Sequence, residues 1–68
     1  MPKTCEQVPQ IERDIAEVEQ QIAAYEAEIA EHPDDERKIA KKQQKIAENQ
    51  EKLAELQADL AEAQADCG

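Results

Sequence analysis

The sequence predicts an all-α protein: a two-helix antiparallel coiled-coil hairpin, folded as a single domain over residues 1–68 and stapled by one disulfide that joins its two ends. Three observations lead to this expectation. Each half of the chain carries large apolar residues at heptad spacing, the pattern breaks once near Pro33, and one cysteine lies near each end. Two helices with a short connection between them become antiparallel neighbours.

The composition favours a coiled coil over an ordinary globular domain. The 68 residues include 8 basic and 17 acidic side chains, which gives a formal net charge of -9. Twelve of the hydrophobic residues are Ala, and only twelve other side chains are large enough to fill a core. Twelve large side chains are too few to form the core of an ordinary globular domain of 68 residues. Ala, Glu, Lys, Leu and Arg make up about half of the chain, as in long helices and coiled coils.

A heptad repeat in the first half predicts the first helix. The large apolar residues there are spaced alternately three and four positions apart, and we assign the first of them to position a. They are Val8, Ile11, Ile15, Val18, Ile22, Tyr25 and Ile29. A stripe that occupies two positions in seven is the narrow seam of a left-handed coiled coil, and a disordered chain would not maintain it.

Pro9 indicates where this helix begins, because proline is tolerated only near a helix start. We expect an N-terminal arm over residues 1–7 and a helix over residues 8–32. The segment Thr4-x-x-Gln7 also fits a capping box. That earlier start would place Pro9 in the second turn without its backbone bond to Cys5, so we favour the later one.

The segment around Pro33 predicts the connection between the helices. Proline fits the beginning of a helix, and the acids that follow it complement the positive end of a helix dipole. We therefore expect a turn over residues 33–35 and a second helix over residues 36–66. His32, the only histidine, is interpreted as a turn or capping residue and not as a ligand or a titrating group.

The second helix repeats the seam with two polar interruptions. Its apolar members are Ile39, Ile46, Leu53, Leu56 and Leu60. Lys42 and Asn49 occupy d positions, and we interpret both as register-setting residues that lower stability while they fix the alignment and the number of helices. Lys42 is expected to extend its ammonium group into water. Asn49 is expected to interrupt an apolar layer opposite Ile22, with no evident hydrogen-bond partner.

The cysteines distinguish two possible alignments of the helices. In an antiparallel pair, a layers face d layers, so the numbers of facing residues add either to 71 or to 64. At 64, Asn49 would face Ile15 and Lys42 would face Ile22, deep in the seam, and Cys67 would have no partner. At 71, Cys67 lies opposite Thr4 and beside Cys5. We therefore predict a Cys5–Cys67 disulfide, which in the chain-entropy model contributes about 4 kcal/mol of stability. The alternative is two free thiols in a reducing compartment.

The sequence offers no catalytic, cofactor-binding or metal-binding residues that we can identify. We find no nucleophile, base and orienting group within reach of one another. Two thiolates without further ligands do not form a zinc site. An acidic chain with one aromatic residue is a poor match for nucleic acid. Its longest aliphatic run is three residues, so we expect neither a membrane span nor a signal peptide.

We therefore expect a non-enzymatic structural or protein-interaction module, a stapled hairpin that is either self-standing or excised from a larger protein; a designed origin is also compatible with the regular heptads. One alternative is an acidic adaptor or inhibitor that presents one helix face to a partner protein. The other is a homodimeric four-helix bundle, although we expect mainly a monomer. The bundle is suggested by alanines at position b of successive heptads: Ala16, Ala23, Ala30, Ala40, Ala47, Ala54 and Ala61. The localisation stays open, but a disulfide requires an oxidising compartment or oxidation in vitro.

Overall fold

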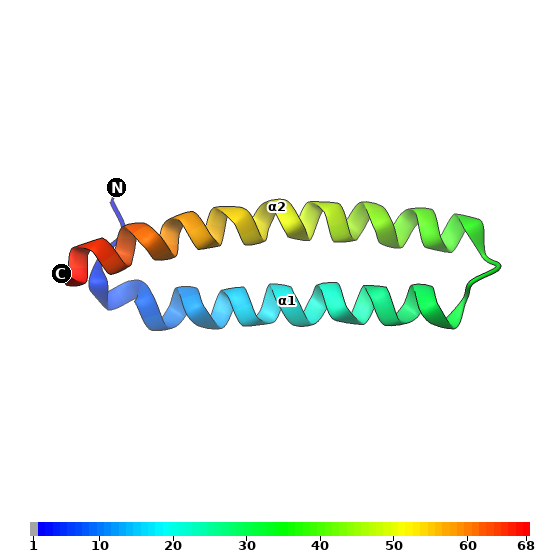
Figure 1. The fold of residues 1–68 in the computed structure, drawn as a ribbon, viewed down its shortest axis with the longest axis horizontal. Coiled ribbons are helices and arrows are strands. Elements are labelled where there is room, and N and C mark those ends of the chain that lie inside the picture. The colour runs from blue at the N-terminus through cyan, green and yellow to red at the C-terminus, as the bar shows by residue number, and fades with distance from the viewer. Residues whose placement is uncertain (1) are drawn as a thin grey trace.

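The structure, a computed structural model, describes residues 2–68 and has the predicted fold class. A 3-10 helix, η1 (Cys5–Gln7), leads into α1 (Val8–Glu31), and a short turn connects α1 to α2 (Glu36–Cys67). The two long helices lie side by side and run in opposite directions (Figure 1). The rod measures 50 × 16 × 13 Å, and its radius of gyration of 15.2 Å exceeds the value of about 11 Å for a globular domain of this length.

The N-terminal segment is more ordered than the predicted arm. Thr4 precedes η1, and the Gln7 side chain accepts a hydrogen bond from the Thr4 backbone N–H, with a distance of 2.8 Å. We expected that a cap at Thr4 would leave the Cys5 carbonyl without the N–H that Pro9 lacks, and this expectation was wrong. In the 3-10 turn the Cys5 carbonyl accepts from the N–H of Val8, so it does not need the N–H that Pro9 lacks.

The connection is a tight turn that Asp35 ends. The N–H of His32 donates to the Ile29 carbonyl at 3.1 Å, and the N–H of Asp35 donates to the His32 carbonyl at 3.2 Å. The Asp35 side chain then accepts from the backbone N–H of Lys38 at 3.0 Å, which caps α2. This N-cap satisfies one of the free donors at the helix start. The helix boundaries lie within one residue of the predicted ones.

The apolar seam lies between α1 and α2. Each of the twelve large apolar residues named above is buried or half-buried, whereas the seven alanines at position b are exposed. Among the described residues 2–68, the buried ones are Ile11 and Val18, each 6% exposed, and Ala63, which is fully covered. This follows from the architecture, because a helix with a single neighbour is open to solvent on its other sides. Ala63 lies at the end of the rod where η1 also packs against α2.

Contacts at both ends of the rod agree with the alignment in which facing numbers add to 71. Glu28 pairs with Lys42, and Cys5 is bonded to Cys67, so these pairs add to 70 and 72. In the alternative alignment the same partners would be six or eight positions out of line, about 9–12 Å along a helix. The individual layers of the seam stay a prediction.

Asn49 has a hydrogen-bond partner that the sequence did not reveal. Its Nδ2 donates to the backbone carbonyl of Lys45, one turn earlier in α2, at 2.8 Å. The expectation of an unpaired amide was therefore wrong. The side chain is half-buried, and its hydrogen bond lies within α2.

Replacing Asn49 with leucine should stabilise the hairpin. The substitution adds apolar area at a seam position. It also removes the side-chain donor to the Lys45 carbonyl, but that carbonyl lies inside α2 and keeps its backbone hydrogen bond, so no polar group is left unpaired. The free energy of unfolding should rise by about 1 kcal/mol, as measured by thermal and urea unfolding. Gln44→Leu, at an exposed position of the same helix, is the control and should change little. A lower melting temperature for Asn49→Leu at unchanged molecular mass would contradict the seam assignment.

Candidate functional site

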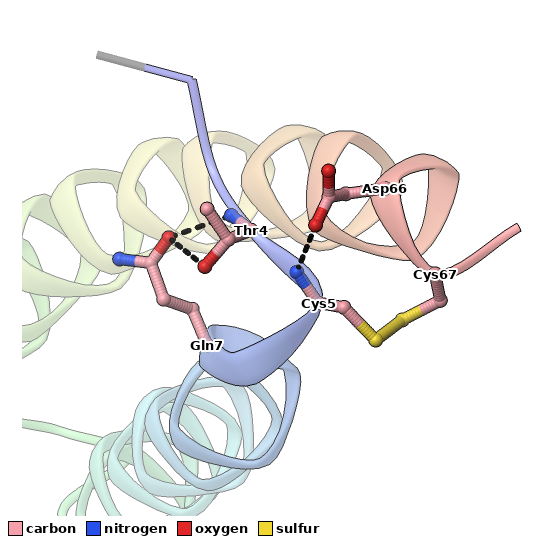
Figure 2. The surroundings of a disulfide bond; sticks show 5 residues. All are labelled: Thr4, Cys5, Gln7, Asp66 and Cys67. Carbon is pink, nitrogen blue, oxygen red and sulfur yellow. Dashed lines mark hydrogen bonds between the residues drawn. A yellow bond between two sulfur atoms is a disulfide. The ribbon is translucent and has the colours of Figure 1, made fainter.

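The two chain ends meet in a compact arrangement that we call the terminal clasp, formed by residues 3–7, 59, 62, 66 and 67. Three consecutive backbone N–H groups donate to three different side chains, each at 2.8 Å (Figure 2 shows two of them). Lys3 donates to Glu62 Oε1, Thr4 donates to Gln7 Oε1, and Cys5 donates to Asp66 Oδ2. The extended residues before η1 are thereby held on the C-terminal turns of α2.

The disulfide of the clasp confirms the predicted pairing. Cys5 and Cys67 are bonded, with Cα atoms 4.8 Å apart and a sequence separation of 62 residues. This distance is ordinary for a disulfide. Both cysteines sit at element ends, Cys5 at the start of η1 and Cys67 at the end of α2, and Figure 2 shows their side chains directed toward each other beside the hydrogen bond from Cys5 to Asp66.

Sequence reasoning missed the carboxylates of the clasp. Glu62 is exposed, and its Oε1 accepts the Lys3 N–H. The Lys3 ammonium lies 3.9 Å from Asp59 Oδ2. A signal was present, since Asp59, Glu62 and Asp66 are spaced three and four residues apart and therefore share one face of a helix. The sequence did not indicate that the N-terminal arm would fold back across this face.

The second polar cluster lies near the turn, around Lys42. Its Nζ lies 2.8 Å from Glu28 Oε2 on α1 and 5.2 Å from the centroid of the Tyr25 ring. The latter distance is within the range of a cation–π contact. The expectation that this ammonium extends freely into water was wrong, because α1 supplies both an anion and an aromatic face. The Lys42 side chain is only 21% exposed.

Lys42 also changes the acidity of its partner. The hydrogen bond from Lys42 holds the pKa of Glu28 below its ordinary value of 4.5, and this effect outweighs desolvation, which acts in the opposite direction. The nearby charges of Lys42, Lys38 and His32 add to the lowering. The Glu28 side chain is 45% exposed, so water screens the pair and its contribution to stability is small.

The disulfide cysteines and the two predicted register-setting residues therefore lie in different parts of the rod. The disulfide belongs to the clasp, Lys42 belongs to the cluster near the turn, and Asn49 lies between them on α2. Within residues 2–68, no three His, Cys, Asp or Glu side chains are placed to hold a metal ion. In the same range no helix is long and apolar enough to cross a membrane.

Comparisons with protein-family models, with curated proteins and with solved structures find no significant match to this chain.

Reduction of the disulfide should destabilise the hairpin. The bond closes a loop of some sixty residues, so its loss should lower the free energy of unfolding by about 4 kcal/mol in the chain-entropy model. Urea unfolding monitored by circular dichroism, with and without reductant, measures the difference. The double variant Cys5→Ser, Cys67→Ser is the control and should not respond to reductant. Intact-mass spectrometry should find the oxidised chain two hydrogens lighter; free thiols or a covalent dimer would refute the pairing.

Acidification should remove the contribution of the Glu28–Lys42 pair. Because the folded-state pKa of Glu28 is lowered, the pair stabilises the fold above the ordinary pKa of 4.5, and this stabilisation disappears as the pH falls through the lowered value. The stability difference between the native sequence and Glu28→Gln should therefore be largest near pH 7 and shrink below pH 4.5. Glu17→Gln removes an exposed carboxylate from the same helix as a control. A difference for Glu28→Gln that is independent of pH would contradict this role.

Proposed function

We propose that the chain is a non-enzymatic structural or protein-interaction module, a stapled helical hairpin that acts as a short rigid rod. The observation that carries this proposal is the Cys5–Cys67 bond, which locks the ends of both helices together. The large apolar residues are used between the two helices. Hydrogen bonds at 2.8 Å hold the chain ends or link neighbouring turns, and the Glu28–Lys42 pair joins the two helices. These are the properties of a spacer or of a platform that presents a surface.

A rod of this kind has a defined length and two different ends. It extends 50 Å along its axis, with both chain ends at one end and the turn at the other (Figure 1). A segment joined to either chain end would lie beside the clasp, whereas the turn and the first half of α2 would project away from it. The turn and the first half of α2 are then open to contact with another protein, so an acidic partner-binding adaptor or inhibitor is the second candidate.

The oligomeric state tests the module as we propose it. Because α1 and α2 cover each other's apolar stripe, the oxidised hairpin should sediment as a monomer at high micromolar concentration. A clean dimer mass would instead support a four-helix bundle, in which the exposed alanines at position b approach a second copy. Ala47→Gln, with Ala54→Gln, adds bulk to that face and should leave a monomer unchanged, whereas it should dissociate a bundle.

A pulldown separates the two roles within the proposal. Immobilised oxidised hairpin should retain a defined protein if the chain is an adaptor and nothing specific if it is only a spacer. The double variant Cys5→Ser, Cys67→Ser, which cannot form the disulfide, serves as the matched bait. A protein retained equally by both baits would not support an adaptor.

A further inference from the structure

The positive charge of this acidic chain is concentrated in one short segment. Residues 36–45 contain five of the eight Lys and Arg side chains and only one of the seventeen acids, so this segment has a net charge of +4 in a chain of net charge -9. All ten residues belong to the first turns of α2, next to the turn. We call the five cations the basic patch: Arg37, Lys38, Lys41, Lys42 and Lys45.

The patch occupies one connected surface. Lys38, Lys41 and Lys45 are spaced three and four residues apart and share a helix face. Together with Asp35, Arg37 and Lys42 they line one open hollow. Arg37, Lys41 and Lys45 are exposed, and Lys38 is half-buried. The side chains are thus within reach of a molecule that docks from solvent.

Four cations of the patch have no anionic partner in the hairpin. Across residues 2–68, the ion pairs join Lys3 to Asp59 and Lys42 to Glu28. Glu28 therefore forms its ion pair with Lys42, whereas Lys38 acts on it only as a nearby charge. The remaining four charges lie side by side although most of the chain is acidic.

This arrangement opposes local helix stability. Like charges three or four residues apart repel each other on a helix surface. Cations near a helix start also face the positive end of the helix dipole, and Arg37, Lys38 and Lys41 lie within the first two turns of α2. Local choices that disagree with the fold are expected at functional surfaces. A bound anion would remove both penalties.

We infer that the basic patch docks a short acidic segment of a partner protein, which deepens the protein-interaction form of the proposed function. The small size of the basic patch favours a short acidic peptide over larger anions. The patch is about 12 Å long, given a rise of 1.5 Å per residue, and charges beyond about 8 Å are largely screened at physiological salt. A short acidic peptide therefore meets mainly the patch.

Larger anionic surfaces are disfavoured by the rest of the rod. A membrane or a nucleic-acid duplex lying along α2 would also meet its acidic half, which includes Glu48, Glu51, Glu55 and Glu62. A second copy of the chain brings its own net charge of -9. Its acidic clasp face is also already engaged by Lys3. A short acidic peptide from another protein does not reach the acidic half of α2, and it does not carry the net charge of a second copy.

The experiment titrates the oxidised, isotope-labelled full chain with a six-residue glutamate peptide and follows the backbone amide resonances. Shifts should concentrate in residues 36–45 and weaken as salt is raised. Lys41→Gln with Lys45→Gln should reduce the affinity at least about tenfold. The matched control, Arg13→Gln with Lys52→Gln, produces the same change in net charge outside the patch and should change the affinity less than about twofold.

Other outcomes overturn the inference. No shifts at millimolar peptide, shifts spread along the rod, or equal losses in both double variants would each refute an acidic-peptide site. Tighter binding of the same chain to phosphatidylserine vesicles or to a thymidine oligonucleotide would assign the patch to those ligands instead. Sedimentation of the same sample keeps the two proposals apart, because a monomer without peptide binding refutes only the docking site, whereas a dimer refutes the proposed monomeric module.

Discussion

The bond between Cys5 and Cys67 makes a closed ring of all residues between them, since it joins positions 62 apart in the sequence. The rest of the structure depends on this closure, because the seam by itself buries little. Within residues 2–68, only Ile11, Val18 and Ala63 are buried, and each long helix packs mainly against the other. Small scaffolds with such thin cores require a cross-link or another external constraint. The disulfide supplies it by restricting the unfolded chain.

The polar contacts are arranged around this closure. At the closed end, carboxylates of α2 accept hydrogen bonds from the backbone N–H groups of Lys3 and Cys5. These bonds hold Cys5 beside Cys67 in addition to the disulfide. Near the turn, Lys42 connects α2 to Glu28 and Tyr25 of α1. The two clusters hold the helices in alignment at opposite ends, and the apolar seam occupies the length between them.

The fold was predictable because its determinants are periodic. Heptad spacing indicated the two helices and their alignment, Pro33 indicated the turn, and the alignment in turn brought the two cysteines together. The clasp was not predictable in the same way. It requires that Lys3 meet Asp59 and Glu62, and the course of an arm outside the repeat cannot be read from spacing. Asn49 and Lys42 were placed at seam positions, but their partners depend on side-chain rotamers.

The closure also determines how the rod transmits force. Both chain ends lie at the same end of the molecule (Figure 1), so tension applied between them passes directly through the Cys5–Cys67 bond. The helices lie outside the load path, and about 200 Å of potential extension stays hidden inside the ring. Reduction would move the load onto the seam, which would then peel open from the clasp toward the turn. The thiol redox state therefore sets whether the molecule is an inextensible link or an extensible tether.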